Sequence, residues 1–131
     1  MANPSVTNVD GSNPGPNSAS PDFPQSEIGN VWKMGSFTVT LSPASVANAT
    51  SAEQTFTMTG LLTTDYVYVN KPTAQAGIGI VGARVSAADV LAITFMNSTS
   101  ATVTPTASQS YKVLVVRVQP NATQPSNLFD Y

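Results

Sequence analysis

Apolar and polar residues alternate along several short stretches of the chain, which is the periodicity of a half-buried β-strand. Phe37, Val39 and Leu41 alternate with threonines, and residues 55–59 repeat the pattern. Glycines, prolines and asparagines separate these stretches. Six strands are predicted in this way, over residues 37–41, 55–59, 66–69, 78–85, 90–96 and 111–118. Their number and spacing predict an all-β protein with a single small β-sandwich or barrel-like domain over residues 31–119.

One stretch has conflicting preferences. The sequence Ser-Ala-Ala-Asp at residues 86–89 has the composition of a helix start. The residues that follow include Val90, Ile93 and Phe95, and β-branched and aromatic side chains of this kind favour a strand. We therefore predict a strand across this region.

The last predicted strand has apolar residues on both of its faces. Val113 and Val115 share one face with Arg117, since side chains alternate along a strand. The opposite face carries three aliphatic residues, Leu114, Val116 and Val118. Two apolar faces indicate either a central strand or an outer face that another subunit covers.

The first thirty residues differ in composition from the rest of the chain. They hold five of the ten prolines, and their few apolar residues are scattered among Asn, Ser and Gly. This composition predicts an extended N-terminal arm over residues 1–30 with no core of its own. Two interpretations stay open, a leader without function and an arm that orders against a neighbouring subunit. In the second, the arm's anchors are Val6, Val9, Phe23 and Ile28. The N-terminus has no basic segment followed by an apolar run, so no secretion signal is predicted.

The C-terminal tail, residues 120–131, begins with Pro120, which cannot donate to a strand ladder. It is polar until its last four residues, where Leu128, Phe129 and Tyr131 form an apolar tip. The tip is interpreted either as a frayed terminus or as a segment that docks into a partner.

Charge and composition exclude several classes of function. Charged residues make up 9% of the chain, against about 25% in an average soluble domain. Five basic residues and a net charge of −2 do not provide the footprint of a nucleic-acid-binding protein. No apolar run is long enough for a membrane span, so no membrane partner is predicted. The chain has no cysteine and no histidine, which removes the commonest general base and the commonest transition-metal ligand.

Two patterns resemble catalytic or binding motifs, and neither has the required context. Residues 77–82 match G-x-G-x-x-G, but a dinucleotide site needs a strand before this motif and a helix after it. Here a loop precedes it and a strand is predicted after it, so the glycines are interpreted as sites of close strand approach or bending. The seven carboxylates show no paired or calcium-loop spacing. No enzymatic activity, metal or cofactor is predicted.

Several strings in the second half of the chain look familiar together. They are Val69-Asn70-Lys71-Pro72, Ala83-Arg84-Val85-Ser86-Ala87-Ala88-Asp89, Leu91-Ala92-Ile93-Thr94-Phe95-Met96-Asn97, Thr104-Pro105-Thr106-Ala107 and Tyr111-Lys112-Val113-Leu114-Val115-Val116-Arg117. In this order they resemble a β-module that recurs in the virion proteins of tailed bacteriophages. The resemblance covers about half of the chain.

Small stand-alone modules of this kind resemble capsid decoration (cement) proteins, which are commonly trimers seated on the head lattice. The resemblance implies a virion protein made in the host cytoplasm and bound to the capsid surface, with itself and the major capsid protein as partners. Two alternatives stay open. One is a tail- or head-fibre module or receptor-binding appendage, in which Trp32, Tyr66 and Tyr68 would be the binding aromatics. The other is a small connector or adaptor protein.

Overall fold

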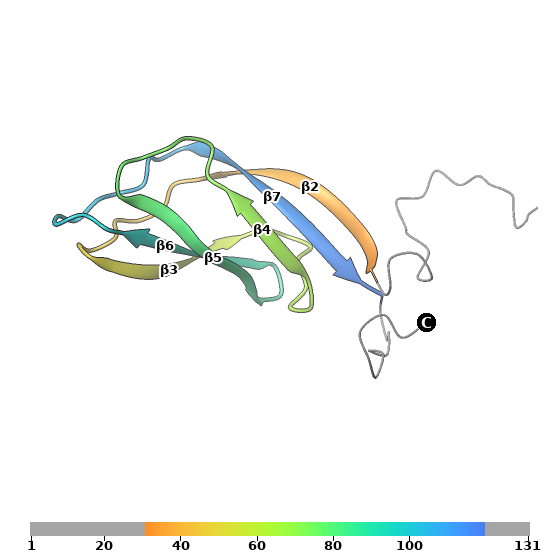
Figure 1. The fold of residues 1–131 in the computed structure, drawn as a ribbon. Helices are drawn as coiled ribbons and strands as arrows, with labels where there is room; N and C mark the ends of the chain where they lie inside the picture. The colour runs from red at the N-terminus through yellow and green to blue at the C-terminus, as the bar shows by residue number, and fades with distance from the viewer. Residues whose placement is uncertain (1–30, 120–131) are drawn as a thin grey trace, which may run out of the picture.

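The computed structural model describes residues 31–119, and within this range it contains strands, turns and loops (Figure 1). The strands are β2 (Val31–Leu41), β3 (Thr50–Thr57), β4 (Tyr66–Asn70), β5 (Ile78–Ala87), β6 (Val90–Asn97) and β7 (Gln109–Val118). The all-β prediction is therefore confirmed. The predicted arm, residues 1–30, and the predicted tail, residues 120–131, lie outside the described residues.

The strands form two antiparallel three-stranded sheets, ordered β2-β7-β4 and β3-β6-β5, which is consistent with a small β-sandwich. The strand with two apolar faces, β7, is the central strand of the first sheet, and β6 is central in the second. Both therefore have backbone partners on each side, whereas β2, β3, β4 and β5 have a free edge among the described strands. Figure 1 shows β2 and β7 running side by side along the length of the domain.

The core lies between the two sheets. Phe95 of β6 packs edge-to-face against Tyr111 of β7, with ring centroids 6.4 Å apart and planes at 89°. Both side chains are fully buried, as are Leu91, Ile93 and Val113. The burial of each aliphatic or phenylalanine side chain in this cluster stabilises the fold by roughly 1.5–3 kcal/mol.

A buried asparagine fixes the loop that follows β6. The side-chain amide of Asn97 donates hydrogen bonds to the carbonyls of Val46 (2.9 Å) and Ala101 (2.8 Å). Its side-chain oxygen accepts hydrogen bonds from the Thr99 amide (2.9 Å) and hydroxyl (2.7 Å). Since every polar atom of this buried side chain has a partner, its burial does not carry the cost of an unpaired amide.

The segment with conflicting preferences forms a hairpin and not a helix, so the predicted strand is confirmed except at residues 88 and 89, which form the turn. β5 continues to Ala87, and β6 begins at Val90 after a two-residue turn at 88 and 89. Asp89 has a φ of 65°, a left-handed conformation that aspartate tolerates better than most residues. Its carboxylate accepts a hydrogen bond from the Gly60 amide (2.7 Å), which ties the hairpin to the loop after β3.

Some predicted strand boundaries are wrong. β3 begins at Thr50 and ends at Thr57, so Met58 and Thr59 belong to the following loop. At this position the Met58 amide donates to the Asp89 carbonyl (2.8 Å) rather than to a neighbouring strand. β2 begins at Val31, well before the predicted start at residue 37.

Candidate interaction site

The outer face of the β2-β7-β4 sheet is apolar along two adjacent cross-strand rows. The first row places Met34 of β2, Val116 of β7 and Tyr66 of β4 opposite one another. The second row places Leu114 of β7 beside Tyr68 of β4, with Ser36 completing it. We call Met34, Tyr66, Tyr68, Leu114 and Val116 the outer apolar face.

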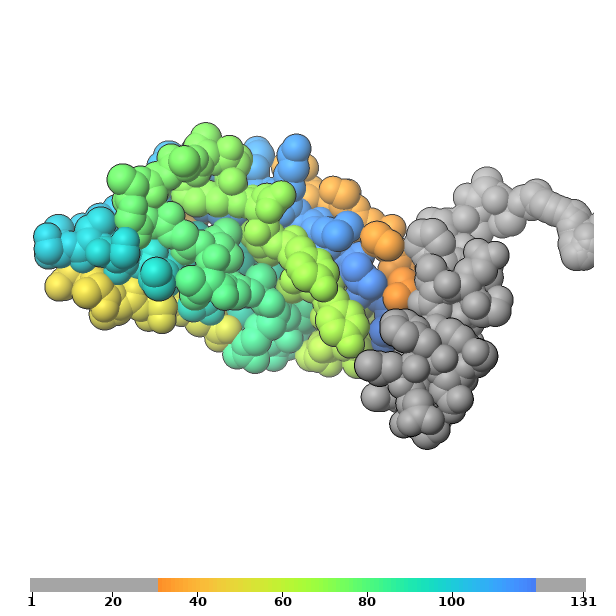
Figure 2. All heavy atoms as spheres, viewed as in Figure 1, coloured from red at the N-terminus to blue at the C-terminus, as the bar shows by residue number. Residues whose placement is uncertain are grey.

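This face is open to solvent. Tyr66 and Tyr68 are 58% and 61% exposed, and Met34 is 43% exposed. Leu114 and Val116 lie between them and are half-buried. In Figure 2 the side chains of β4 (yellow-green) protrude from the molecular surface next to β7 (blue). The next cross-strand row is polar, with Lys112 between Thr38 and Asn70. Contiguous exposed apolar side chains are typical of an interaction surface.

The structure places four of the residues proposed from the sequence as interface residues. Leu114, Val116 and Val118 lie on the outward-facing positions of β7, and all three are half-buried. Trp32 lies in β2 at an irregularity in the β2–β7 register, and the Lys33 ammonium is 4.2 Å from its ring centroid. The other proposed interface residues, Val6, Val9, Phe23, Ile28, Leu128, Phe129 and Tyr131, lie outside the described residues.

The sequence indicates Tyr66 and Tyr68 only as the aromatics of a receptor-binding appendage, and it does not mark Met34 as an interface residue. The signal for Tyr66 and Tyr68 was present in the alternation of 66–69, in which Val67 is buried and both tyrosines face outwards. Their proximity to Leu114 and Val116 depends on the β4–β7 register, which the sequence does not reveal.

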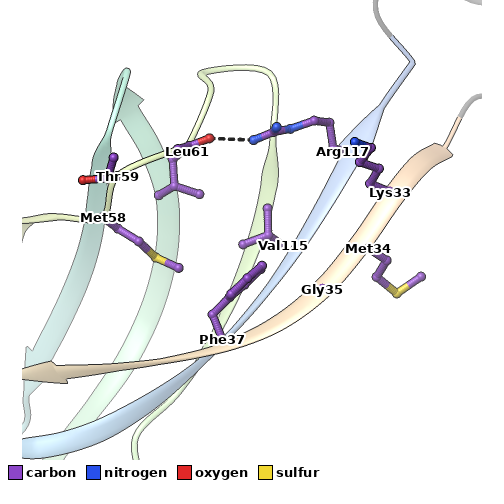
Figure 3. A pocket seen from close by; sticks show the side chains of 10 residues that line it. Lys33, Met34, Gly35, Phe37, Met58, Thr59, Leu61, Val115 and Arg117 are labelled. Atoms are coloured by element: carbon purple, nitrogen blue, oxygen red, sulfur yellow. Dashed lines mark hydrogen bonds between the residues drawn. The ribbon is translucent and has the colours of Figure 1, made fainter. Parts of the chain in front are cut away.

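A second apolar region is a pocket of about 340 Å³ at the end of the sandwich where β2 begins and β7 ends (Figure 3). Phe37, Met58, Leu61 and Val115 line it and point towards one another, whereas Met34 points away. We call this pocket the end groove.

A buried ion pair borders the end groove. The Asp65 side chain is fully buried, and its carboxylate accepts hydrogen bonds from Arg117 Nε (2.8 Å) and a terminal guanidinium nitrogen (2.7 Å). The Leu62 amide donates a third hydrogen bond to it (2.9 Å). The same guanidinium nitrogen donates to the Gly60 carbonyl (2.7 Å), a contact visible in Figure 3. These bonds fix the loop between β3 and β4.

The electrostatics of this pair favour the charged carboxylate. Burial acts to raise the pKa of Asp65, but the hydrogen bonds from Arg117 and Leu62 and the positive charge of Arg117 outweigh it. The pKa of Asp65 therefore lies below its ordinary value. The pair is geometrically complete, so we assign it a structural role.

The remaining charged groups of the described residues do not converge on one place. Glu53 and Arg84 form an exposed ion pair across the second sheet (2.7 Å), and Asp89 caps the loop described above. Residues 31–119 contain no group of three or more acidic side chains that could hold a metal ion together. Within the same range, no helix is long and apolar enough to cross a membrane.

The glycines of the G-x-G-x-x-G string have separate structural roles. Gly77 has a φ of 76° in the turn before β5, and an added Cβ there would collide with the Thr99 side chain. Gly82 lies at a register irregularity between β5 and β6, and Gly79 has open space around it. The string continues into the strand β5, so it lacks the helix of a dinucleotide site.

No protein-family model, no curated protein and no solved structure matches this chain.

Proposed function

We propose that the protein is a structural subunit of a bacteriophage particle, a capsid decoration protein that binds the outer head lattice and stabilises it. The observation that carries the proposal is the outer apolar face, which leaves two tyrosines and a methionine more than 40% exposed on one side of the β2-β7-β4 sheet. The resemblance of residues 69–117 to phage virion modules supplies the class of particle. The low content of charge, 9%, suits a subunit that packs closely against copies of itself and against a shell.

We assign the outer apolar face to contact between copies in a homotrimer. The two apolar rows carry no charged side chain. The charged residue of the neighbouring polar row is Lys112. A second copy therefore meets no like charge across these rows. Tyr66 and Tyr68 suit such a contact, since their rings bury apolar area while their hydroxyls keep hydrogen-bond partners at the rim.

The first experiment measures the copy number of the protein in purified particles, relative to the major capsid protein. Decoration predicts a copy number comparable with that of the major capsid protein. A small fraction of that number would instead indicate the connector or fibre alternatives and would contradict the proposal.

The second experiment tests the face. The double variant Tyr66→Thr/Tyr68→Thr keeps strand-forming residues in β4 and removes both rings. We expect sedimentation to show a trimer for the full chain and a monomer for this variant. The matched control is Val81→Thr, which changes a side chain that is 57% exposed in the other sheet and should leave the trimer intact. A full chain that remains monomeric at micromolar concentrations, free and on particles, would contradict the trimer.

One observation favours a second candidate function. Two neighbouring exposed tyrosines on a strand with a free edge also have the chemistry of a glycan-binding surface, as a receptor-binding appendage requires. Binding of the isolated protein to host cells or glycans, lost in the same double variant, would support that candidate over decoration.

A further inference from the structure

The end groove is a part of the core that the second sheet does not cover. Phe37 lies opposite Val113 on the inner face of the first sheet, yet it is 51% exposed. The ring leans over Gly35, where an added Cβ would lie 2.9 Å from it. An aromatic ring on a core-facing position that remains half in water marks a site that another group can cover.

The lining of the groove specifies the chemistry of its occupant. Its floor is formed by the side chains of Phe37, Met58, Leu61 and Val115, and its volume of about 340 Å³ admits large apolar side chains. Lys33 also lines it, directly opposite Arg117 in the β2–β7 register. Arg117 is already paired with Asp65, whereas Lys33, whose ammonium lies over the Trp32 ring, forms no ion pair among residues 31–119. A fitting occupant is apolar and carries a carboxylate near its apolar groups.

The last residues of the chain have this chemistry. Leu128, Phe129 and Tyr131 supply three large apolar side chains within four positions, and Asp130 supplies the carboxylate. The arm is a poorer match, because Phe23 and Ile28 are separated by polar residues and proline.

The tether is long enough for the segment to reach the groove of its own chain. β7 ends at Val118, next to Arg117 on the groove rim, so the chain leaves the domain at the groove itself. Residues 119–127 span up to about 30 Å when extended. The return path to Val115 covers only three residues of β7, or about 10 Å. A tether of this length gives an intramolecular contact an effective concentration that a second molecule in dilute solution does not reach.

We propose that residues 128–131 fold back into the end groove of the same chain, with the apolar side chains on Phe37 and Met58 and the Asp130 carboxylate beside Lys33. This inference does not rest on the proposed function.

The chain has no cysteine, so a pair of engineered cysteines can form a disulfide without competition from native thiols. The test uses the rate at which this disulfide forms. Thr59 is exposed and lines the groove, so the pair Thr59→Cys/Asn127→Cys places one thiol there and one beside the tail segment. The control pair is Thr57→Cys/Asn127→Cys, because Thr57 is exposed on the outward face of β3, two residues from Thr59, and does not line the groove. Under mild oxidation we expect the Thr59 pair to form an intramolecular disulfide about tenfold faster than the control pair.

Adding Phe129→Ser to both pairs should abolish the difference in rate, because it removes the main apolar anchor. Equal rates in the original pairs would overturn the proposal. A disulfide-linked dimer as the main product would also overturn it, since the groove would then hold the tail of a second copy. Faster coupling of Thr59→Cys to Glu27→Cys than to Asn127→Cys would overturn it in favour of the arm.

Discussion

Replacing Arg117 with methionine isolates the energetic role of the buried ion pair. Methionine keeps most of the apolar stem but removes all three hydrogen bonds that the guanidinium donates to Asp65 and Gly60. The Asp65 carboxylate, whose side chain is fully buried, then keeps only the Leu62 amide as a partner. Breaking a buried pair in this way costs roughly 3–5 kcal/mol.

We expect a loss at neutral pH of about 2–4 kcal/mol, somewhat below that range, because the Arg117 side chain is 26% exposed and water can partly replace it. For a domain of this size each kcal/mol lowers Tm by about 4–8 °C, so Tm should fall by on the order of 10–30 °C. Urea unfolding followed by circular dichroism measures the free energy directly. The matched control, Arg84→Met, breaks the exposed pair with Glu53 and should have a much smaller effect.

The pH dependence gives an independent test with a definite sign. In the native protein the pKa of Asp65 is lowered, so the stability it contributes is fully present above its unfolded pKa of about 3.9. That contribution is lost as the pH falls through the folded pKa. In Arg117→Met, burial without the guanidinium should raise the pKa of Asp65, so protonation relieves the buried charge. The stability difference between the two proteins should therefore narrow between pH 7 and pH 4.

A second substitution completes the test. The single variant Arg117→Met leaves the buried negative charge of Asp65 without a positive partner. The double variant Arg117→Met/Asp65→Asn also removes this charge, so it should be more stable than Arg117→Met at neutral pH. A cost of less than about 1 kcal/mol for Arg117→Met would contradict a stabilising role of the buried pair. A stability deficit that is the same at pH 7 and pH 4 would contradict it as well.

Two further predictions concern single buried or strained positions. Gly77→Ala should destabilise the domain by about 2–3 kcal/mol, because its φ of 76° strains an alanine and the new Cβ collides with Thr99. Gly79→Ala, with no atom within 4 Å of the new Cβ, should change stability by less than about 1 kcal/mol, and equal effects in thermal unfolding would contradict this explanation. Tyr111→Phe removes a buried hydroxyl that has no hydrogen-bond partner among the described residues, so its effect should lie between neutral and a gain of about 1 kcal/mol. A clear loss of stability in urea unfolding would show that the hydroxyl has a partner.

The alternation of apolar and polar residues is enough to predict six strands, because one side of each sheet faces a core and the other faces solvent. It fails at the starts of β2 and β3 for a physical reason. In β2, Lys33 and Gly35 occupy inner positions at the end groove, where the second sheet gives no cover. In β3, residues 50–54 are polar apart from Ala52 and belong to a largely exposed edge strand, so they show no clear apolar period.

The candidate surfaces depend on register, which is why the sequence predicts them only in part. The two apolar faces of β7 are readable from 113–118 alone. Which residues lie beside them is decided by pairings between distant segments. Asp65 and Arg117 are 52 residues apart and meet because Tyr66 pairs with Val116 in the adjacent position. No local pattern marks such a contact before the β4–β7 pairing is known.

The pairing of Val31 with Val118 also determines how the domain responds to mechanical load. The chain enters β2 and leaves β7 at the same end of the same antiparallel pair (Figure 1). A force that pulls the start of β2 away from the end of β7 acts along the hydrogen bonds between these strands. It loads the hydrogen bonds one after another, so β2 separates from β7 step by step. A force applied between either end and the loops at the far end of the sandwich loads many hydrogen bonds at once in shear. The domain therefore resists a force between Val31 and Val118 weakly, and it resists a force along the length of the sandwich strongly.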